Sequence, residues 1–250
     1  MNTDQACACN PVAHHDYDAK GTWIEGGLNG LKTYHSPATG GTSKKAILLL
    51  YDVFGFCPQN YQGADMMASN GFDVYIPDVF KGGALDFKQV RSAEASEKQK
   101  IVQAFLSDFP GKCEAQVKPV QDLITTLREK GYTKVGALGL CWGGSMVTYV
   151  PELDAMAMAH PARYGVTAAG AEKLNSPTCL LPSANEDEAQ MKEFHNAMLT
   201  KPVGPQCVLK FYSDCPHGWL AARGDLTLDK GKQKFEEAYH DIITFFTNVL

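Results

Sequence analysis

The sequence predicts an α/β fold with a mainly parallel central sheet and helices on both faces. Short apolar runs alternate with longer stretches in which apolar residues recur every three or four positions. Such alternation is typical of strand–helix–strand units, whose strands lie parallel in one sheet. A chain of 250 residues, 44% of them hydrophobic, is long enough to bury one core of this kind. We therefore predict a polar arm over residues 1–20 and a single domain over residues 21–250.

The expected elements begin with a hairpin and then alternate along the chain. Glycines among apolar residues predict the hairpin at 22–35, and the apolar run at 44–51 predicts a buried strand. Further strands are expected at 72–77, 135–138, 155–159, 178–182 and 207–212, and helices at 60–69, 93–109, 115–130 and 232–248. In the last helix the apolar side chains have the i, i+3, i+4 spacing of a core-facing stripe.

Residues 139–144 (G-L-C-W-G-G) place a cysteine where a predicted strand turns into a helix. A nucleophile elbow of this kind needs small residues two positions either side of the central one, and Gly139 and Gly143 meet that need. The turn would aim the backbone N–H of Trp142 at a developing oxyanion. We predict that Cys141 is a nucleophile; the alternative is a small buried residue in a glycine-rich turn.

A catalytic acid and a histidine are expected after later strands, in that order. His217 lies in the loop after the predicted strand at 207–212 and is the expected base. Three adjacent carboxylates follow the strand at 178–182; we favour Asp187, while Glu186 and Glu188 stay open because acidic residues are common at helix N-termini. A free thiol is only ~3% thiolate at neutral pH, so a neighbouring imidazole that takes the thiol proton is needed to generate the nucleophile. His160 also ends a predicted strand, and we expect it either to support the catalytic groups from behind or to have a structural role.

Three motifs together resemble the dienelactone hydrolase family. They are D-V-F-G at 52–55, G-L-C-W-G at 139–143 and H-G-W-L-A-A-R-G-D at 217–225, where family members carry E-x-F-G, G-x-C-x-G and H-G-F. The similarity runs over most of residues 20–250 and is closest to the fungal and yeast branch. It implies an α/β-hydrolase fold with Cys141 as nucleophile, His217 as base and Asp187 as acid. The N–H groups of Val53 and Trp142 would form the oxyanion hole.

The resemblance also suggests residues that would bind substrate. Asp52 stands where bacterial members have a glutamate that is thought to help deprotonate the thiol. Lys81 follows I-P-D-V-F, near the place of a carboxylate-binding arginine in bacterial relatives. Arg223 is a second candidate for an anionic group, because a guanidinium can hold a carboxylate through two parallel bonds. The pocket mouth is expected to include the aromatic residues Phe54, Phe56, Phe80, Trp142 and Trp219.

Composition excludes several other functions. The chain has 23 basic and 28 acidic residues and a net charge of −5, with no basic cluster longer than two, so nucleic acid is not an expected partner. No G-x-G-x-x-G or G-x-x-x-x-G-K motif indicates a nucleotide cofactor, and no cofactor is expected. No apolar run is long enough to suggest membrane insertion. Eight cysteines without a signal-like segment favour the cytoplasm and reduced thiols, and the spacing of Cys7 and Cys9 does not favour a metal site.

These observations predict a cofactor-independent cysteine hydrolase. Its substrate would be a small lactone or ester, dienelactone-like according to the resemblance, opened through an acyl-enzyme. One alternative is a non-catalytic protein of the same fold that binds a small molecule. Another is a general carboxylesterase or thioesterase, because pocket shape decides between such substrates.

Overall fold

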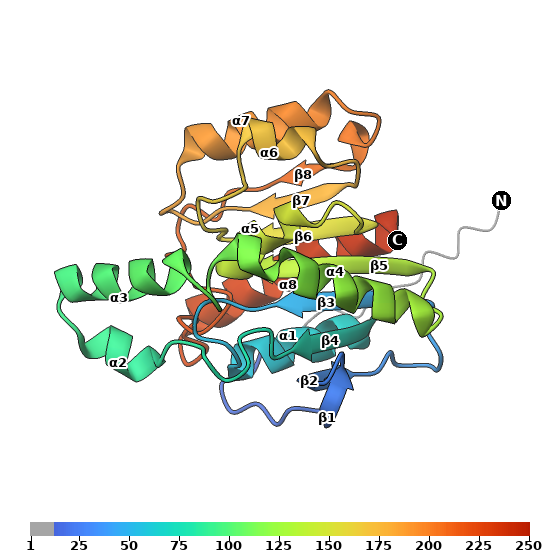
Figure 1. Cartoon of the computed structure of the whole chain (residues 1–250), viewed down its shortest axis with the longest axis horizontal. Coiled ribbons are helices and arrows are strands. Elements are labelled where there is room, and N and C mark those ends of the chain that lie inside the picture. Colours follow the sequence, from blue (N-terminus) through green and yellow to red (C-terminus); the bar gives the residue numbers. More distant parts are fainter. Residues whose placement is uncertain (1–12) are drawn as a thin grey trace.

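The computed structural model describes residues 13–250 and contains one eight-stranded sheet in the order β1-β2-β4-β3-β5-β6-β7-β8 (Figure 1). β2 pairs antiparallel with β1 and β4. The other six strands, β3 to β8, are all parallel to one another. The predicted α/β class with a mainly parallel sheet is therefore confirmed. The strands are β1 (Thr22–Leu28), β2 (Leu31–Ser36), β3 (Lys45–Leu50), β4 (Asp73–Pro77), β5 (Lys134–Leu140), β6 (Ala155–Ala159), β7 (Thr178–Leu181) and β8 (Val208–Leu209).

Helices pack against both faces of the sheet, as Figure 1 shows with α4 and α5 in front and α8 behind. The central strands β3 to β7 are buried almost throughout, which is why they read as continuous apolar runs. The helices are α1 (Pro58–Ala68), α2 (Phe87–Ser92), α3 (Ala95–Ser107), α4 (Cys113–Glu129), α5 (Trp142–Met146), α6 (Ala168–Glu172), α7 (Glu188–Leu199) and α8 (Asp229–Val249), with short 3-10 turns at Val147–Tyr149 and Gly204–Gln206.

Two elements differ from the sequence-based expectation. The helix expected at 93–109 corresponds to α3, whereas α2 was not expected; Ala93 and Glu94, which both have extended backbone angles, separate the two helices. The strand expected at 207–212 is shortened to β8, after which Tyr212 makes only an isolated bridge to Ser183. In Figure 1, α2 and α3 lie beyond the ends of the strands. α3 has no buried residue.

The described part of the predicted N-terminal arm contacts the domain. The Tyr17 hydroxyl and the Lys20 amide both donate to the Asp65 carboxylate of α1 at 2.8 Å, and the Ala13 amide donates to Glu236 of α8. Residues 1–12, including Cys7 and Cys9, lie outside the described residues. Between residues 13 and 250, none of the helices combines the length and the apolar character needed to cross a membrane.

Candidate active site

Cys141 occupies a strained turn between β5 and α5. Its backbone angles are φ 53° and ψ −106°, a conformation that non-glycine residues rarely adopt. The turn is so tight that a Cβ on Gly143 would lie 2.0 Å from the Leu50 carbonyl oxygen, and one on Gly139 would lie 2.2 Å from the Gly143 oxygen. The local geometry therefore requires both glycines and leaves the Cys141 side chain half-buried at the carboxyl end of the sheet.

A histidine and a carboxylate line up behind the cysteine sulfur. His217 Nε2 lies 3.0 Å from Cys141 Sγ, and His217 Nδ1 lies 2.7 Å from Glu186 Oε1. The loop after β8 carries His217, and its backbone N–H donates to Asn185 Oδ1 at 2.7 Å. Burial alone would lower the pKa of His217, but the negative charges of Cys141 and Glu186 and their hydrogen bonds raise it to about 10. The site therefore favours the imidazolium form of His217.

The carboxylate beside His217 is Glu186, which corrects the sequence-based choice of Asp187. Asp187 is the N-cap of α7 and accepts a hydrogen bond from the Gln190 amide at 3.1 Å, while Glu188 pairs with Lys192 on the surface. Glu186 has a side chain only 5% exposed, and its second oxygen accepts from the Ser183 amide. The sequence contained a signal for this role of Asp187. D-E-A-Q at 187–190 matches a capping box, in which the aspartate caps the N-terminus of a helix.

Two backbone N–H groups beside Cys141 have no acceptor among residues 13–250. They belong to Val53, in the loop after β3, and to Trp142, the first residue of α5. The indole of Trp142 donates to the Gly111 carbonyl at 2.6 Å and is fully buried, so this side chain is part of the core rather than the expected pocket mouth. The elbow and the loop after β3 thus present two unpaired donors close to Cys141, where they could stabilise a negatively charged oxygen.

Asp52 is buried under the same loop. Its side chain is 2% exposed, and its two oxygens accept from the amides of Phe54 at 2.9 Å and Ala222 at 3.3 Å. Burial raises the pKa of Asp52 to about 6, against the opposing effects of these amides and of the charges on His217 and Arg223. Asp52 therefore ties the β3 loop to the segment after His217, and its carboxyl is partly protonated near neutral pH.

His160, which directly follows β6, lies beside the imidazole of His217. The ring centroids of His160 and His217 are 5.2 Å apart, and the planes are inclined by 68°. His160 is fully buried, has φ 37°, and neither ring nitrogen has a partner among the described atoms. Burial, reinforced by the charge of His217, holds the pKa of His160 well below its usual range. A neutral, fully buried ring therefore packs against one side of His217.

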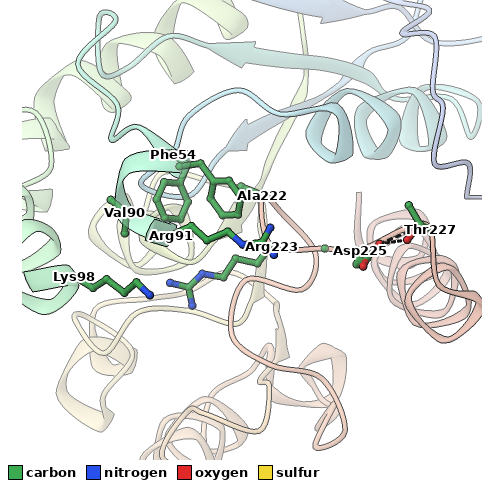
Figure 2. A pocket seen from close by; sticks show the side chains of 10 residues that line it. Phe54, Val90, Arg91, Lys98, Ala222, Arg223, Asp225 and Thr227 are labelled. Carbon is green, nitrogen blue, oxygen red and sulfur yellow. Dashed lines mark hydrogen bonds between the residues drawn. The ribbon is translucent and has the colours of Figure 1, made fainter. Parts of the chain in front are cut away.

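A cavity of about 690 Å³ opens next to the loop that carries Val53. Of the residues expected to bind substrate, Phe54 and Arg223 line it (Figure 2). Phe80, by contrast, is buried in the core against Trp142, with ring centroids 4.6 Å apart. The cavity is lined by Phe54, Phe87, Val90, Arg91, Lys98, Ala222, Arg223, Gly224, Asp225 and Thr227.

Three further residues expected at the pocket do not line this cavity. Trp219 is buried and stacks on Tyr212 at 4.6 Å between ring centroids. Lys81 is exposed, with its amine 6.0 Å from the Phe109 ring. Phe56 packs edge-on against Tyr51. The rings of Trp219 and Phe56 and the amine of Lys81 thus contact other neighbours instead of this cavity.

Comparison with known proteins assigns the family. A family model described as the dienelactone hydrolase family matches residues 31–250. The chain belongs to the dienelactone hydrolase family. Membership makes it a hydrolase of the ester and lactone type.

Relatives of this dienelactone hydrolase family member span nearly its whole length. An AIM2 family protein of Schizosaccharomyces pombe, described as uncharacterized, is 31% identical over 245 residues, covering 96% of this chain and 95% of the relative. A carboxymethylenebutenolidase homolog of Rattus norvegicus is 24% identical and covers 100% of this chain and 99% of its own. The solved dienelactone hydrolase of Anabaena variabilis has the same fold, with a TM-score of 0.60, 13% identity, and coverage of 92% of this chain and 98% of that one.

Proposed function

We propose that this protein is a cysteine-dependent hydrolase that opens a small lactone or ester through an acyl-enzyme intermediate. The observation that carries the proposal is the contiguous chain of Cys141 Sγ, His217 and Glu186, with contacts of 3.0 and 2.7 Å. Nucleophile, base and an orienting acid in hydrogen-bond contact are the arrangement that covalent acyl transfer needs.

The first half of the reaction transfers the acyl group to sulfur. His217 holds the proton of the Cys141 thiol, and the thiolate attacks the carbonyl carbon of the substrate. The N–H groups of Val53 and Trp142 donate to the resulting oxyanion. The tetrahedral intermediate collapses with cleavage of the ester C–O bond, and His217 gives its proton to the leaving oxygen. In a lactone that oxygen stays attached to the acyl group, so the ring opens on the enzyme.

The second half regenerates the thiolate. His217 accepts a proton from a water molecule, the hydroxide attacks the thioester carbonyl, and the same two N–H groups stabilise the second oxyanion. The C–S bond then breaks, and the product leaves as a carboxylic acid. Glu186 keeps Nδ1 protonated and stabilises the imidazolium in both halves.

The substrate class is supported by the family and by the relatives. The family description and the name of the rat homolog both refer to unsaturated lactones, and the cavity is within the ~300–1,000 Å³ typical of small-molecule sites. The aromatic ring of Phe54 on its wall suits a planar, unsaturated acyl group.

The test is hydrolysis of dienelactone, followed by its absorbance, beside p-nitrophenyl acetate. Wild type is compared with Cys141→Ala and with Cys207→Ala, because Cys207 is also half-buried but lies away from His217. We expect turnover of both compounds by wild type and Cys207→Ala and none by Cys141→Ala. Ester turnover alone would indicate a general carboxylesterase. Dienelactone binding without turnover would indicate the non-catalytic alternative, and turnover retained in Cys141→Ala would refute the cysteine mechanism.

A further inference from the structure

A second, smaller cavity of about 300 Å³ lies beside His217 and Glu186. Its other walls are the segment after β6, which includes Pro161 and Tyr164, and the loop from β7 into α7, which includes Asp187. It shares no lining residue with the larger cavity of about 690 Å³. The smaller cavity is therefore a separate space that meets the catalytic histidine.

The strand order places the two cavities on opposite sides of Cys141. β5, which leads into Cys141, lies between β3 and β6, and all three strands are parallel (Figure 1). The loop after β3 carries Phe54, which lines the larger cavity, whereas the loops after β6 and β7 line the smaller one. A substrate bound at Cys141 can therefore extend in two directions.

The proposed reaction distinguishes these two directions. His217 Nε2, 3.0 Å from Cys141 Sγ, must pass its proton to the leaving oxygen, and proton transfer needs hydrogen-bond contact. The leaving oxygen therefore lies next to His217, and the group attached to it extends toward the smaller cavity. The acyl group takes the direction of Val53 and Phe54, along the larger cavity.

The wall formed by the segment after β6 is held against the nucleophile elbow. The Ala162 N–H donates to the Cys141 carbonyl at 3.0 Å, and the Ser145 hydroxyl donates to the Ala162 carbonyl at 2.8 Å. The side-chain amide of Gln190 donates to the Arg163 carbonyl at 3.0 Å, which ties this segment to α7. These bonds fix the wall relative to Cys141, so the cavity is preorganised for a group that leaves from this centre.

The lining of the smaller cavity suits a neutral, planar group. Tyr164 is 53% exposed, and Pro161 and Met191 add apolar surface. Among residues 13–250, Arg163 forms no salt bridge, and the carboxylate of Asp187 in the same cavity carries the opposite charge. Tyrosine and arginine side chains both stack on flat rings. The cavity therefore offers stacking surface without an excess of positive charge.

We propose that the smaller cavity binds the alcohol part of the substrate, and that the substrate is an ester of a neutral aromatic alcohol. When the ester C–O bond breaks, His217 gives its proton to the alcohol oxygen, and the acyl group stays on the Cys141 sulfur. The aromatic alcohol leaves through this cavity, and the water that hydrolyses the thioester takes its place next to His217. This inference rests on the proposed hydrolytic function.

The test uses acetate esters that share an acyl group and differ in the alcohol. β-Naphthyl acetate and hexafluoroisopropyl acetate have leaving alcohols of nearly equal acidity, but only the first is aromatic. A β-naphthyl acetate with a sulfonate on the ring adds a negative charge to the same aromatic system. Tyr164→Ala is compared with Phe109→Ala, because the two side chains are 53% and 51% exposed but Phe109 lines neither cavity.

We expect the ratio of kcat/KM for β-naphthyl acetate to that for the hexafluoroisopropyl ester to fall about tenfold in Tyr164→Ala and to be unchanged in Phe109→Ala. All three esters form the same acetyl-enzyme, so the ratio reports acylation alone. An equal ratio in the two variants would overturn the proposed site.

The sulfonated ester tests the charge of the alcohol. Wild type should turn it over more slowly than β-naphthyl acetate, although its naphthol is the better leaving group, because the carboxylates of Asp187 and Glu186 line the cavity. Faster turnover of the sulfonated ester would overturn the assignment of a neutral alcohol.

A binding measurement separates this inference from the proposed function. β-Naphthol, the leaving alcohol itself, is titrated into wild type and both variants and followed by its fluorescence, without any need for turnover. Weaker binding to Tyr164→Ala alone supports the alcohol site even if no ester is cleaved. Equal affinity in all three proteins, or no binding to any of them, overturns it, whether or not Cys141-dependent hydrolysis is observed.

Discussion

Replacing Glu186 by glutamine should remove most of the activity while leaving the fold intact. The pKa of His217 rises from the usual 6.5 to about 10, despite the opposing effect of burial, and this corresponds to about 5 kcal/mol of imidazolium stabilisation shared by the Cys141 charge and Glu186. If Glu186 supplies half, its loss costs about 2–3 kcal/mol, or at least about 30-fold in kcat/KM. If the glutamine amide also reverses the tautomer of His217, the loss approaches the order of 10⁴ seen in serine triads.

The matched control is Asp187→Asn, one residue away. Asparagine caps a helix as well as aspartate does, so α7 should keep its N-terminal hydrogen bond from Gln190 and activity should change by less than about twofold. Hydrolysis of p-nitrophenyl acetate gives kcat/KM for both variants, and thermal unfolding shows that both are folded. A loss below threefold for folded Glu186→Gln, or a larger loss for Asp187→Asn, would refute the assignment of the acid.

Three other predictions concern the thiol, the elbow and the buried carboxyl. Cys141 should be the first cysteine alkylated by chloroacetamide at pH 7, and His217→Ala should slow it at least about tenfold, as measured by peptide mass spectrometry; faster labelling of another cysteine would contradict the ion pair. Gly143→Ala should destabilise the fold by about 2 kcal/mol or more in urea unfolding, because the new methyl group would collide with the Leu50 carbonyl; an unchanged midpoint would contradict the tight turn. Asp52 has a folded-state pKa of about 6, above its usual 3.8, so its contribution to stability is full below pH ~4 and is lost as the pH rises through 6. Wild type should therefore lose up to about 3 kcal/mol relative to Asp52→Asn between pH 4 and 7, and a constant difference in unfolding free energy would refute this.

Local signals in the sequence were sufficient to predict the sheet and to predict that Cys141 and His217 lie at the same end of it. The apolar runs at β5 and β6 could be read because buried parallel strands are apolar on both faces. The glycines around Cys141 predicted the elbow for a steric reason that the structure reproduces, since both sit against backbone atoms. The carboxylate beside His217 was harder to predict. Glu186, Asp187 and Glu188 are adjacent, and which of them faces His217 depends on the exact residue at which α7 begins.

Long-range neighbours could not be read in the same way. Phe80 and Trp219 follow the carboxyl ends of β4 and β8. Whether an aromatic ring there points to the core or to a cavity depends on packing partners far along the chain. Arg91 and Lys98 were missed for a related reason. They are ordinary exposed helix residues until α2 and α3 bring them beside Arg223, more than 120 positions later.

The weak attachment of α2 and α3 to the rest of the domain has a consequence for engineering. Val90 is the one buried residue of these two helices, and apart from it and Phe105, which packs edge-on against the buried Phe80, most side chains of residues 87–107 are exposed and can change with little effect on folding. Cys141, His217 and Glu186 lie instead in the loops after the carboxyl ends of the strands, where Gly139 and Gly143 leave no room for a side chain. We therefore expect substitutions at the exposed positions of residues 87–107 to change the lining of the cavity without disturbing Cys141, His217 and Glu186, and a combinatorial library confined to those positions would test this.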